Sequence, residues 1–349
     1  MSRRCGFVLA GSPDQLTGGY LYDARIGAGL RELGWTIDTH GLAGSFPRPD
    51  AQARESLGRC LAAQTEGSLV LIDGLVLGGL PEPVRVHAER LALVALVHHP
   101  LARESGLDAT AQEQLFASEK AALACVRRVI VTSAFTAREL QPYGVPAAKI
   151  RVVEPGVDPA PLAPADHDPP RLLCVASLTP RKGHTVLVEA LAALRALPWQ
   201  CTLAGSTTRD PAHAARVKAA IEAHGLGERI GLAGELQPAA LREHWLAADL
   251  FVLPSLYEGY GMVVSEAIAH GLPVLTTTGG ALAETLPAGA GRLVAPGDPA
   301  ALAAALEALL QDTAARHALR EGARRARGTL PDWQEAARAF AAALEGIEA

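Results

Sequence analysis

Apolar segments of strand length alternate with amphipathic segments of helix length along most of the chain. In the first half this pattern predicts strands at residues 6–10, 35–39, 68–72, 91–97 and 129–131, and helices at 20–33, 51–65 and 115–126. In the second half it predicts strands at residues 172–176, 201–205, 230–233, 250–253 and 273–276, and helices at 262–270, 300–310 and 333–344. Strands alternating with helices are typical of parallel sheets covered on both faces. We therefore expect an α/β protein.

The stretch between the two series divides the chain. Residues 155–170 contain six prolines and show no hydrophobic periodicity. At 349 residues the chain has the length of two average domains. We expect a first domain at residues 1–155, a linker at 156–170, a second domain at 171–328 and a last helix within 329–349. That helix either packs back on the first domain or covers the second.

Composition excludes several classes of protein. The net charge is −5, and the one dense basic cluster, residues 320–327, lies on a late helical segment where a solvated helix face is the favoured interpretation. Nucleic acid is therefore not an expected partner. The five cysteines are scattered and show neither a disulfide framework nor a zinc spacing. We find no signal peptide and no apolar run long enough to span a bilayer, so we expect a cytoplasmic protein.

Residues 255–266 carry the clearest functional signal. They follow a buried strand and lead into a helix, so they should lie at the carboxyl edge of a parallel sheet. Gly259 and Gly261 allow close approach of a ligand to the backbone, and the start of a helix binds phosphate. Glu258 and Glu266 stand on either side of this helix start. A nucleotide sugar, with hydroxyls at both ends and a diphosphate between, fits this pattern; the alternative is a plain loop with two solvated glutamates.

Two features of the first half of the chain also indicate a ligand-binding site, but they are less specific. His98 and His99 follow the apolar strand at residues 91–97, where a ligand site is expected, although a histidine that bonds a backbone carbonyl is equally consistent. Gly18 and Gly19 precede a helix and indicate either a phosphate contact or an ordinary helix start.

Together these residues resemble a known family. The resemblance rests on residues 254–280 (Glu258-Gly259-Tyr260-Gly261-Met262, Glu266-Ala267, His270-Gly271-Leu272-Pro273-Val274 and Gly279-Gly280), on Gly18-Gly19 and His98-His99, and on Pro155-Gly156-Val157-Asp158, Lys182-Gly183 and Pro296-Gly297-Asp298. In this order they resemble the family 4 retaining glycosyltransferases. The resemblance implies the GT-B architecture, in which two Rossmann-like parallel-sheet domains face each other across a cleft. It runs over nearly the whole chain.

The resemblance also implies roles for individual residues. Glu258 would contact hydroxyls of the donor sugar, Glu266 would contact the ribose, and Lys182 would neutralise the diphosphate. Backbone N–H groups of residues 260–263 would hold the distal phosphate, with Gly234 to Leu236 beside the base and Gly18 and Gly19 approaching the diphosphate. His98 fits the family's sugar-contacting histidine best, and His99 stays an alternative. The donor-site residues implied are Gly18, Gly19, His99, Gly234, Leu236, Gly259, Tyr260, Gly261, Met262, Val263 and Glu266, with Glu258, His98, Lys182 and Arg181 as the catalytic set.

One position departs from the family pattern. Ser177 stands where the family usually has an arginine, which removes a forked donor suited to phosphate. Arg181 either substitutes for that arginine from the next turn or is an exposed charge at the start of a helix. Both interpretations stay open on the sequence alone.

The implied activity is transfer of a sugar from a nucleotide diphosphate donor with retention of anomeric configuration. A UDP-sugar is favoured, UDP-glucose is the first guess, and a GDP-sugar is an alternative. No metal and no cofactor are expected, because no Asp-x-Asp or cluster of metal ligands is visible. Hydrogen bonding by Glu258 with front-face attack is favoured over a covalent glycosyl-enzyme. A nucleotide-sugar epimerase and a non-catalytic nucleotide-sugar-binding protein are the alternatives.

The acceptor is unidentified at this stage. The first domain is expected to bind it, with Tyr20, Tyr22, Asp73 and Glu104 as candidates by their position near strand ends. A small acceptor or a growing glycan fits equally well.

Overall fold

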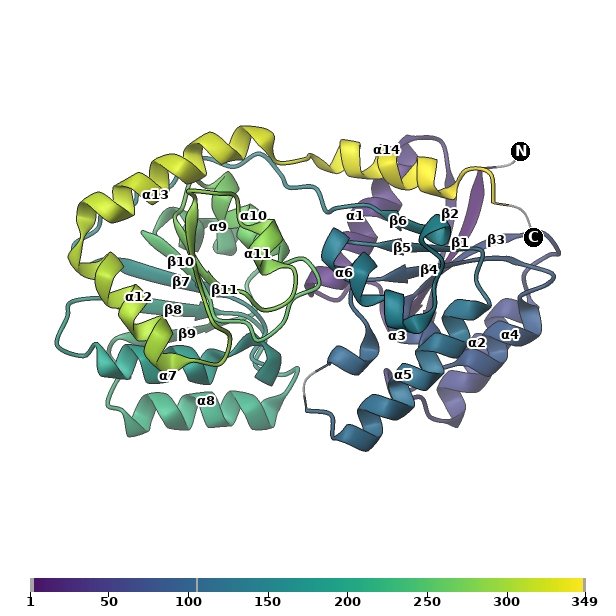
Figure 1. Cartoon of the computed structure of the whole chain (residues 1–349), viewed down its shortest axis with the longest axis horizontal. Coiled ribbons are helices and arrows are strands. Elements are labelled where there is room, and N and C mark those ends of the chain that lie inside the picture. Colours follow the sequence, from purple (N-terminus) through teal and green to yellow (C-terminus); the bar gives the residue numbers. More distant parts are fainter. Residues whose placement is uncertain (1–2, 105, 348–349) are drawn as a thin grey trace. The chain divides into compact units, whose positions relative to one another are not determined.

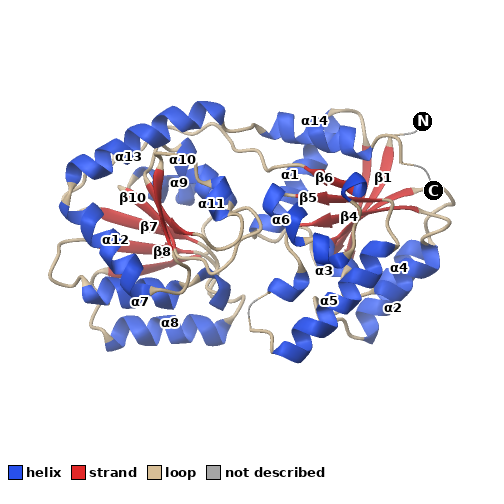
Figure 2. Ribbon diagram, in the orientation of Figure 1, coloured by secondary structure: helices blue, strands red, loops and turns tan. Residues whose placement is uncertain are grey.

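The computed structural model describes residues 3–104 and 106–347, which form two compact α/β units (Figure 1, Figure 2). Unit 1 combines the residues up to Gly156 with those from Pro331 onward, and unit 2 comprises Val157–Leu330. Each unit has its own parallel sheet of six strands and its own core. No helix in the described ranges combines the length and apolar character needed to cross a membrane.

The sheet of unit 1 has the strand order β2-β1-β3-β4-β5-β6. Its strands are β1 (Arg4–Ala10), β2 (Thr36–Leu42), β3 (Leu69–Asp73), β4 (Ala92–Val97), β5 (Arg128–Val131) and β6 (Ile150–Val152). All neighbouring pairs are parallel, and β4 is buried at every position because helices cover both faces of the sheet. The parallel arrangement brings the ends of β1, β3 and β4 to one edge.

Seven helices surround this sheet within the described ranges: α1 (Gly18–Glu32), α2 (Ala51–Ala62), α3 (Gly74–Leu77), α4 (Pro81–His87), α5 (Ala109–Ala124), α6 (Ala134–Glu139) and α14 (Trp333–Leu344). The last helix packs against the first, so unit 1 contains both ends of the chain. The two helices approach closely at Gly29, where an added Cβ would lie 2.5 Å from Cβ of Ala337. Short 3₁₀ turns at Leu101–Arg103, Gln141–Tyr143 and Ala147–Lys149 complete the unit.

The sheet of unit 2 has the order β12-β11-β10-β7-β8-β9. Its strands are β7 (Arg171–Val175), β8 (Gln200–Ala204), β9 (Ile230–Gly234), β10 (Leu250–Leu253), β11 (Val274–Thr277) and β12 (Gly291–Val294). Its helices are α7 (His184–Ala193), α8 (Pro211–Ala223), α9 (Pro238–Leu246), α10 (Met262–Ala269), α11 (Leu282–Thr285), α12 (Pro299–Gln311) and α13 (Thr313–Ala326). Two 3₁₀ turns lie at Pro180–Lys182 and Arg327–Thr329.

The segment expected to be a linker packs on unit 2. The N–H of Ala163 donates to the carbonyl of His270 (2.9 Å), and Asp249 accepts from the N–H of His167 (2.9 Å). Arginines of the basic cluster also hold this segment: Arg320 donates to the carbonyls of Pro164 and Ala165 (2.8 and 2.9 Å). The prediction of a purely solvated basic face was therefore wrong, because these guanidinium groups bond backbone carbonyls that have no strand partner.

The strands predicted from the sequence are all present, with ends displaced by a few residues. The pattern missed β6 and β12, which lie at sheet edges and are exposed or half-exposed, so they lack a continuous apolar run. It also placed the start of α5 too late, at residue 115, because residues 109–114 are mostly alanine and polar side chains without a buried stripe.

Candidate functional site

The loop between β10 and α10 is fixed by the neighbouring loop after β11. Glu258 forms an isolated parallel bridge with Gly280, whose φ is +68°. A Cβ on Gly280 would lie 2.1 Å from the carbonyl oxygen of Glu258, so only glycine fits there. The loop therefore presents Glu258 from a rigid backbone at the carboxyl edge of the unit 2 sheet.

The carboxylate of Glu258 is buried and accepts three hydrogen bonds. Oε1 accepts from Nζ of Lys182 (2.6 Å) and from Oγ of Ser255 (2.7 Å), and Oε2 accepts from Nη1 of Arg181 (3.1 Å). Burial by itself would raise the pKa of Glu258, but the charges of Lys182 and Arg181 outweigh burial and lower the pKa to about 2. This group is ionised at every physiological pH and holds two cations at one point.

Arg181 and Lys182 come from a 3₁₀ turn that follows β7. Gly183 ends this turn with φ +69°, and a Cβ there would lie 2.1 Å from the carbonyl oxygen of Pro254. This close approach of two loops directs both basic side chains to Glu258. The Arg181 side chain is only 16% exposed and also donates to the carbonyl of Tyr257 (2.8 Å), so the alternative of an exposed charge does not describe it.

The other predicted donor residues of unit 2 lie along the same carboxyl edge. Gly261, with φ +93°, precedes α10, and its carbonyl accepts from the N–H of Val264 (2.8 Å). Met262, Val263 and Glu266 belong to the first two turns of α10 and are half-buried. Gly259 is buried, and the carbonyl of Tyr260 accepts from Oγ1 of Thr285 (2.6 Å). Gly234 ends β9, which is separated from β10 by β7 and β8, with Leu236 in the following loop.

A second cluster lies in unit 1, at the ends of β3 and β4. Nε2 of His98 lies 3.1 Å from Oδ1 of Asp23 and 3.5 Å from Oδ2 of Asp73. Burial raises the pKa of Asp23, and burial together with the Asp23 charge raises that of Asp73 to about 7. Burial would lower the pKa of His98, but the two carboxylates raise it. The sequence was equally consistent with a histidine that bonds a backbone carbonyl. In the structure the His98 ring contacts two carboxylates instead.

Sequence reasoning missed Asp23. It lies one turn into α1, inside a helical pattern where an aspartate normally faces solvent, yet its side chain is only 3% exposed. Its position four residues after Gly19 is the one signal that could have placed it on the face of α1 that bears the glycine.

The remaining candidates of unit 1 lie around this cluster. Gly18 begins α1, and Gly19 lies against the His98 ring, where an added Cβ would be 3.3 Å from Cδ2. Nε2 of His99 lies 3.2 Å from Oε2 of Glu104. Tyr20 donates its hydroxyl to the carbonyl of Ala10 (2.5 Å).

Tyr22 does not fit its expected role. Its side chain is completely buried, and its hydroxyl donates to the carbonyl of Val153 (2.9 Å). A residue with no exposed surface is a core residue, so Tyr22 is not in a position to contact an acceptor.

Among the described residues, Asp23, Asp73 and His98 form the one group of three potential ligand side chains whose ligand atoms lie within 4.8 Å of one another. The separations of the ring nitrogen from the two oxygens are those of a hydrogen bond and a longer polar contact. The sequence showed no cluster of potential metal ligands because these three residues come together only in the fold. Metal independence stays a prediction.

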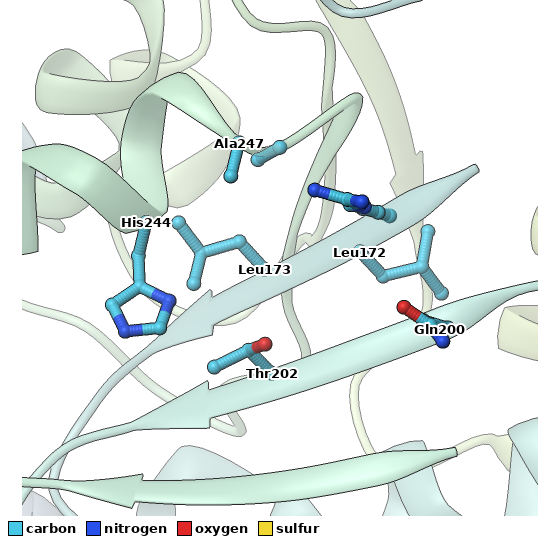
Figure 3. A pocket seen from close by; sticks show the side chains of 8 residues that line it. Leu172, Leu173, Gln200, Thr202, His244 and Ala247 are labelled. Atoms are coloured by element: carbon cyan, nitrogen blue, oxygen red, sulfur yellow. The ribbon is translucent and has the colours of Figure 1, made fainter. Parts of the chain in front are cut away.

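A cavity of about 260 Å³ lies elsewhere on unit 2 (Figure 3). It is lined by Arg171, Leu172, Leu173, Gln200, Thr202, His244, Ala247 and Ala248. Arg171 and Gln200 are the first residues of β7 and β8, so the cavity lies near the amino ends of these strands. Open α/β sheets bind ligands at the opposite edge, and no predicted site residue lines this cavity.

Solved structures share the fold over nearly the full chain. Sucrose-phosphate synthase from Thermosynechococcus elongatus aligns with a TM-score of 0.81 over 97% of both chains, at 24% identity. Anabaena HepE, crystallised with UDP and glucose, aligns with a TM-score of 0.76 over 99% of this chain and 100% of its own, at 18% identity. Two Rossmann-like domains of this kind define the GT-B class, which is the fold predicted from the sequence.

Sequence comparison gives the family. The profile described as glycosyl transferases group 1 matches residues 163–326, and that described as glycosyltransferase family 4 matches residues 77–161. The chain belongs to the family 4 glycosyltransferases, as residues 254–280 had indicated.

Curated relatives are similar over part or most of their length. A D-inositol 3-phosphate glycosyltransferase of Kineococcus radiotolerans is 34% identical over 53% of this chain and 49% of its own. An MMP alpha-(1->4)-mannosyltransferase of Mycolicibacterium hassiacum is 27% identical over 90% of this chain and 80% of its own. The chain spans about half the length of the first of these relatives.

Proposed function

We propose that the protein is a retaining glycosyltransferase that moves a sugar from a nucleotide diphosphate donor to a hydroxyl of an acceptor. The observation that carries the proposal is the Glu258 cluster. A buried, ionised carboxylate holds Lys182 and Arg181 together beside the start of α10. Two cations beside a helix N-terminus suit a diphosphate, and a carboxylate at the same point suits sugar hydroxyls.

The main requirement of this reaction is stabilisation of the leaving group. The bond between the anomeric carbon and the diphosphate oxygen breaks while positive character grows on the sugar. Lys182 and Arg181 would stabilise the departing diphosphate, which supports Arg181 as the replacement for the arginine missing at Ser177. Backbone N–H groups of residues 260–263 would bind the distal phosphate, and Glu266 the ribose. Gly234 to Leu236 would lie beside the base.

The anomeric configuration is retained if the acceptor attacks the sugar on the face from which the diphosphate leaves. The acceptor oxygen forms the new bond, and its proton passes to the departing phosphate oxygen. Glu258 is already engaged by Lys182, Arg181 and Ser255, which favours hydrogen bonding to the sugar over nucleophilic attack. His98 would contact the donor sugar, with Gly18 and Gly19 near the diphosphate. Asp73, Tyr20 and Glu104 stay the acceptor candidates.

A UDP-sugar is the favoured donor, with UDP-glucose first, and HepE, which was crystallised with UDP-glucose, supports this choice. A GDP-sugar stays the alternative. One relative is named as a mannosyltransferase, so mannose is a second candidate for the transferred sugar. For the acceptor, the names of several relatives point to an inositol phosphate. We propose that neither a metal nor a cofactor is required.

The experiment is a transfer assay with a panel of UDP- and GDP-sugars and hydroxyl acceptors that includes inositol 3-phosphate, followed by mass spectrometry. We expect one donor to yield a glycosylated product whose anomeric configuration, read by NMR, matches that of the donor. Inverted configuration would contradict retention. Release of an isomerised sugar without an acceptor would contradict the proposal and indicate a nucleotide-sugar epimerase.

A further inference from the structure

One face of α1 surrounds the imidazole of His98. Gly19 lies against Cδ2, the Tyr22 ring meets the imidazole edge to face with centroids 5.4 Å apart, and Asp23 lies 3.1 Å from Nε2. Positions 19, 22 and 23 have the i, i+3, i+4 spacing that puts side chains on the same face of a helix. Three successive contacts from one helix restrict both the position and the rotation of the ring.

Of the two carboxylates beside the ring, Asp23 is the better hydrogen-bond acceptor. Its separation from Nε2 is within hydrogen-bond range, whereas the 3.5 Å to Asp73 is long. The other oxygen of Asp73, Oδ1, accepts from the N–H of Leu75 (3.0 Å) and holds this carboxylate in place at its longer distance from the ring. A ring N–H donates well to one acceptor, so the geometry favours a proton on Nε2 directed at Asp23.

The last helix supports this arrangement from behind. The Tyr22 ring contacts Trp333 and Phe340 of α14, with centroid separations of 6.0 and 6.4 Å. Its hydroxyl is anchored on Val153. Tyr22 is therefore held by α14 on one side and supports His98 on the other.

We propose that Gly19, Tyr22 and Asp23 form a clamp that fixes the orientation and tautomer of His98, with Asp23 as its positioning residue. The proposal rests on the role of His98 in the proposed transfer reaction. The clamp also explains why residue 19 is glycine, because a Cβ there would lie only 3.3 Å from Cδ2 of His98. The titratable groups facing the ring are Tyr22 and Asp23 from α1 and Asp73 from the end of β3.

The test uses the full chain with ¹⁵N-labelled histidine, with the His98 signals assigned through His98→Gln. At a pH above the raised pKa of His98, where the ring is neutral, we expect Nε2 to carry the proton in the unliganded protein and Asp23→Ala to yield mixed tautomers. Asp23→Asn, whose amide oxygen still accepts, should retain more of the Nε2–H form. Asp38→Asn is the matched control, since Asp38 pairs with Arg4 on the surface of the same unit. A neutral ring that carries its proton on Nδ1 instead of Nε2, or an unchanged tautomer in Asp23→Ala, would overturn the clamp.

Turnover supplies a second readout. We expect Asp23→Ala to lower kcat about 10- to 100-fold by misplacing His98, with the donor KM little changed. Tyr22→Leu removes the ring contact and should lower kcat as Asp23→Ala does, whereas the control Asp38→Asn should leave kcat unchanged. Thermal melting identifies variants that lose activity by unfolding. If the protein transfers no sugar at all, the proposed function fails, while the tautomer measurement still decides whether the clamp exists.

Discussion

Nζ of Lys182 lies 2.6 Å from Oε1 of Glu258, and the two side chains are 19% and 7% exposed. An ion pair so removed from water is costly to break on one side only, because the remaining charge loses its partner. The two residues are separated by 76 positions in the sequence, and the fold brings them together through the adjacent strands β7 and β10.

Lys182→Ala should reduce kcat/KM for the nucleotide sugar by on the order of 10²–10³, because a fixed charge aimed at the departing diphosphate is lost. Steady-state kinetics measures this. Lys218→Ala is the control, since Lys218 is exposed on α8 and pairs loosely with Glu222 at 3.9 Å. Equal kcat/KM values for the two variants would show that Lys182 does not contribute to the reaction.

Glu258→Gln separates an enzyme from a binding protein. An enzyme should lose most of its turnover but keep nucleotide-sugar affinity within about tenfold, or about 1.4 kcal/mol. Glu222→Gln on the exposed face of α8 should change neither quantity. Affinity and turnover are measured on the same preparations. If the wild type has no turnover with any acceptor and the variant still binds, the non-catalytic alternative gains support.

Glu119 should make the stability of unit 1 fall as pH rises from about 4.5 to about 8. Its Oε2 accepts from the N–H of Leu101 (2.9 Å), and burial raises its pKa to about 8. The unfolded chain ionises this group near 4.5 while the folded one keeps it protonated, so stability falls by about 1.4 kcal/mol per pH unit between these values.

Glu119→Gln removes that dependence and keeps an acceptor for Leu101. We expect the melting temperature of the variant to increase relative to that of the wild type as pH rises from 5 to about 8. This range lies between the pKa of Glu119 in the unfolded chain and its raised pKa in the folded protein. A constant difference across this range would show that Glu119 is ionised in the folded protein.

Gly29 tests the contact between α1 and α14. An added methyl group would overlap Cβ of Ala337, so Gly29→Ala should destabilise by about 1–3 kcal/mol. Gly58 lies within α2 with open space around it, and Gly58→Ala should stabilise by about 0.5–1 kcal/mol. Denaturant titrations of the two variants should therefore shift in opposite directions. A stabilising Gly29→Ala would contradict the close packing of α14.

The strand and helix pattern was predictable because buried parallel strands are apolar throughout, as in β4 and β10. The edge strands β6 and β12 were not, since exposed strands carry no such signal. The resemblance placed Glu258, Lys182 and Arg181 in one catalytic set but left open whether Arg181 is an exposed charge, and the structure pairs it with Glu258. No local pattern could show this, because its partner lies 77 residues away.

Asp23 and Tyr22 show the limits of reasoning from position. Tyr22 looked available near a strand end, but the last helix buries it, and that helix lies more than 300 residues further along the chain. Asp23 lies within a helical pattern and was not singled out from the sequence, yet its side chain is 3% exposed and lies 3.1 Å from His98. Both outcomes follow from packing between distant segments, which periodicity does not report.

The most direct test of the account is isothermal titration of the purified protein with UDP, GDP and ADP in the presence of a chelator. We predict micromolar binding of one nucleotide, with UDP first, and its loss in Lys182→Ala. Binding that appears only after a divalent cation is added would contradict metal independence. Absence of binding for all three nucleotides, with and without a cation, would contradict the assignment of the Glu258 cluster as a nucleotide-sugar site.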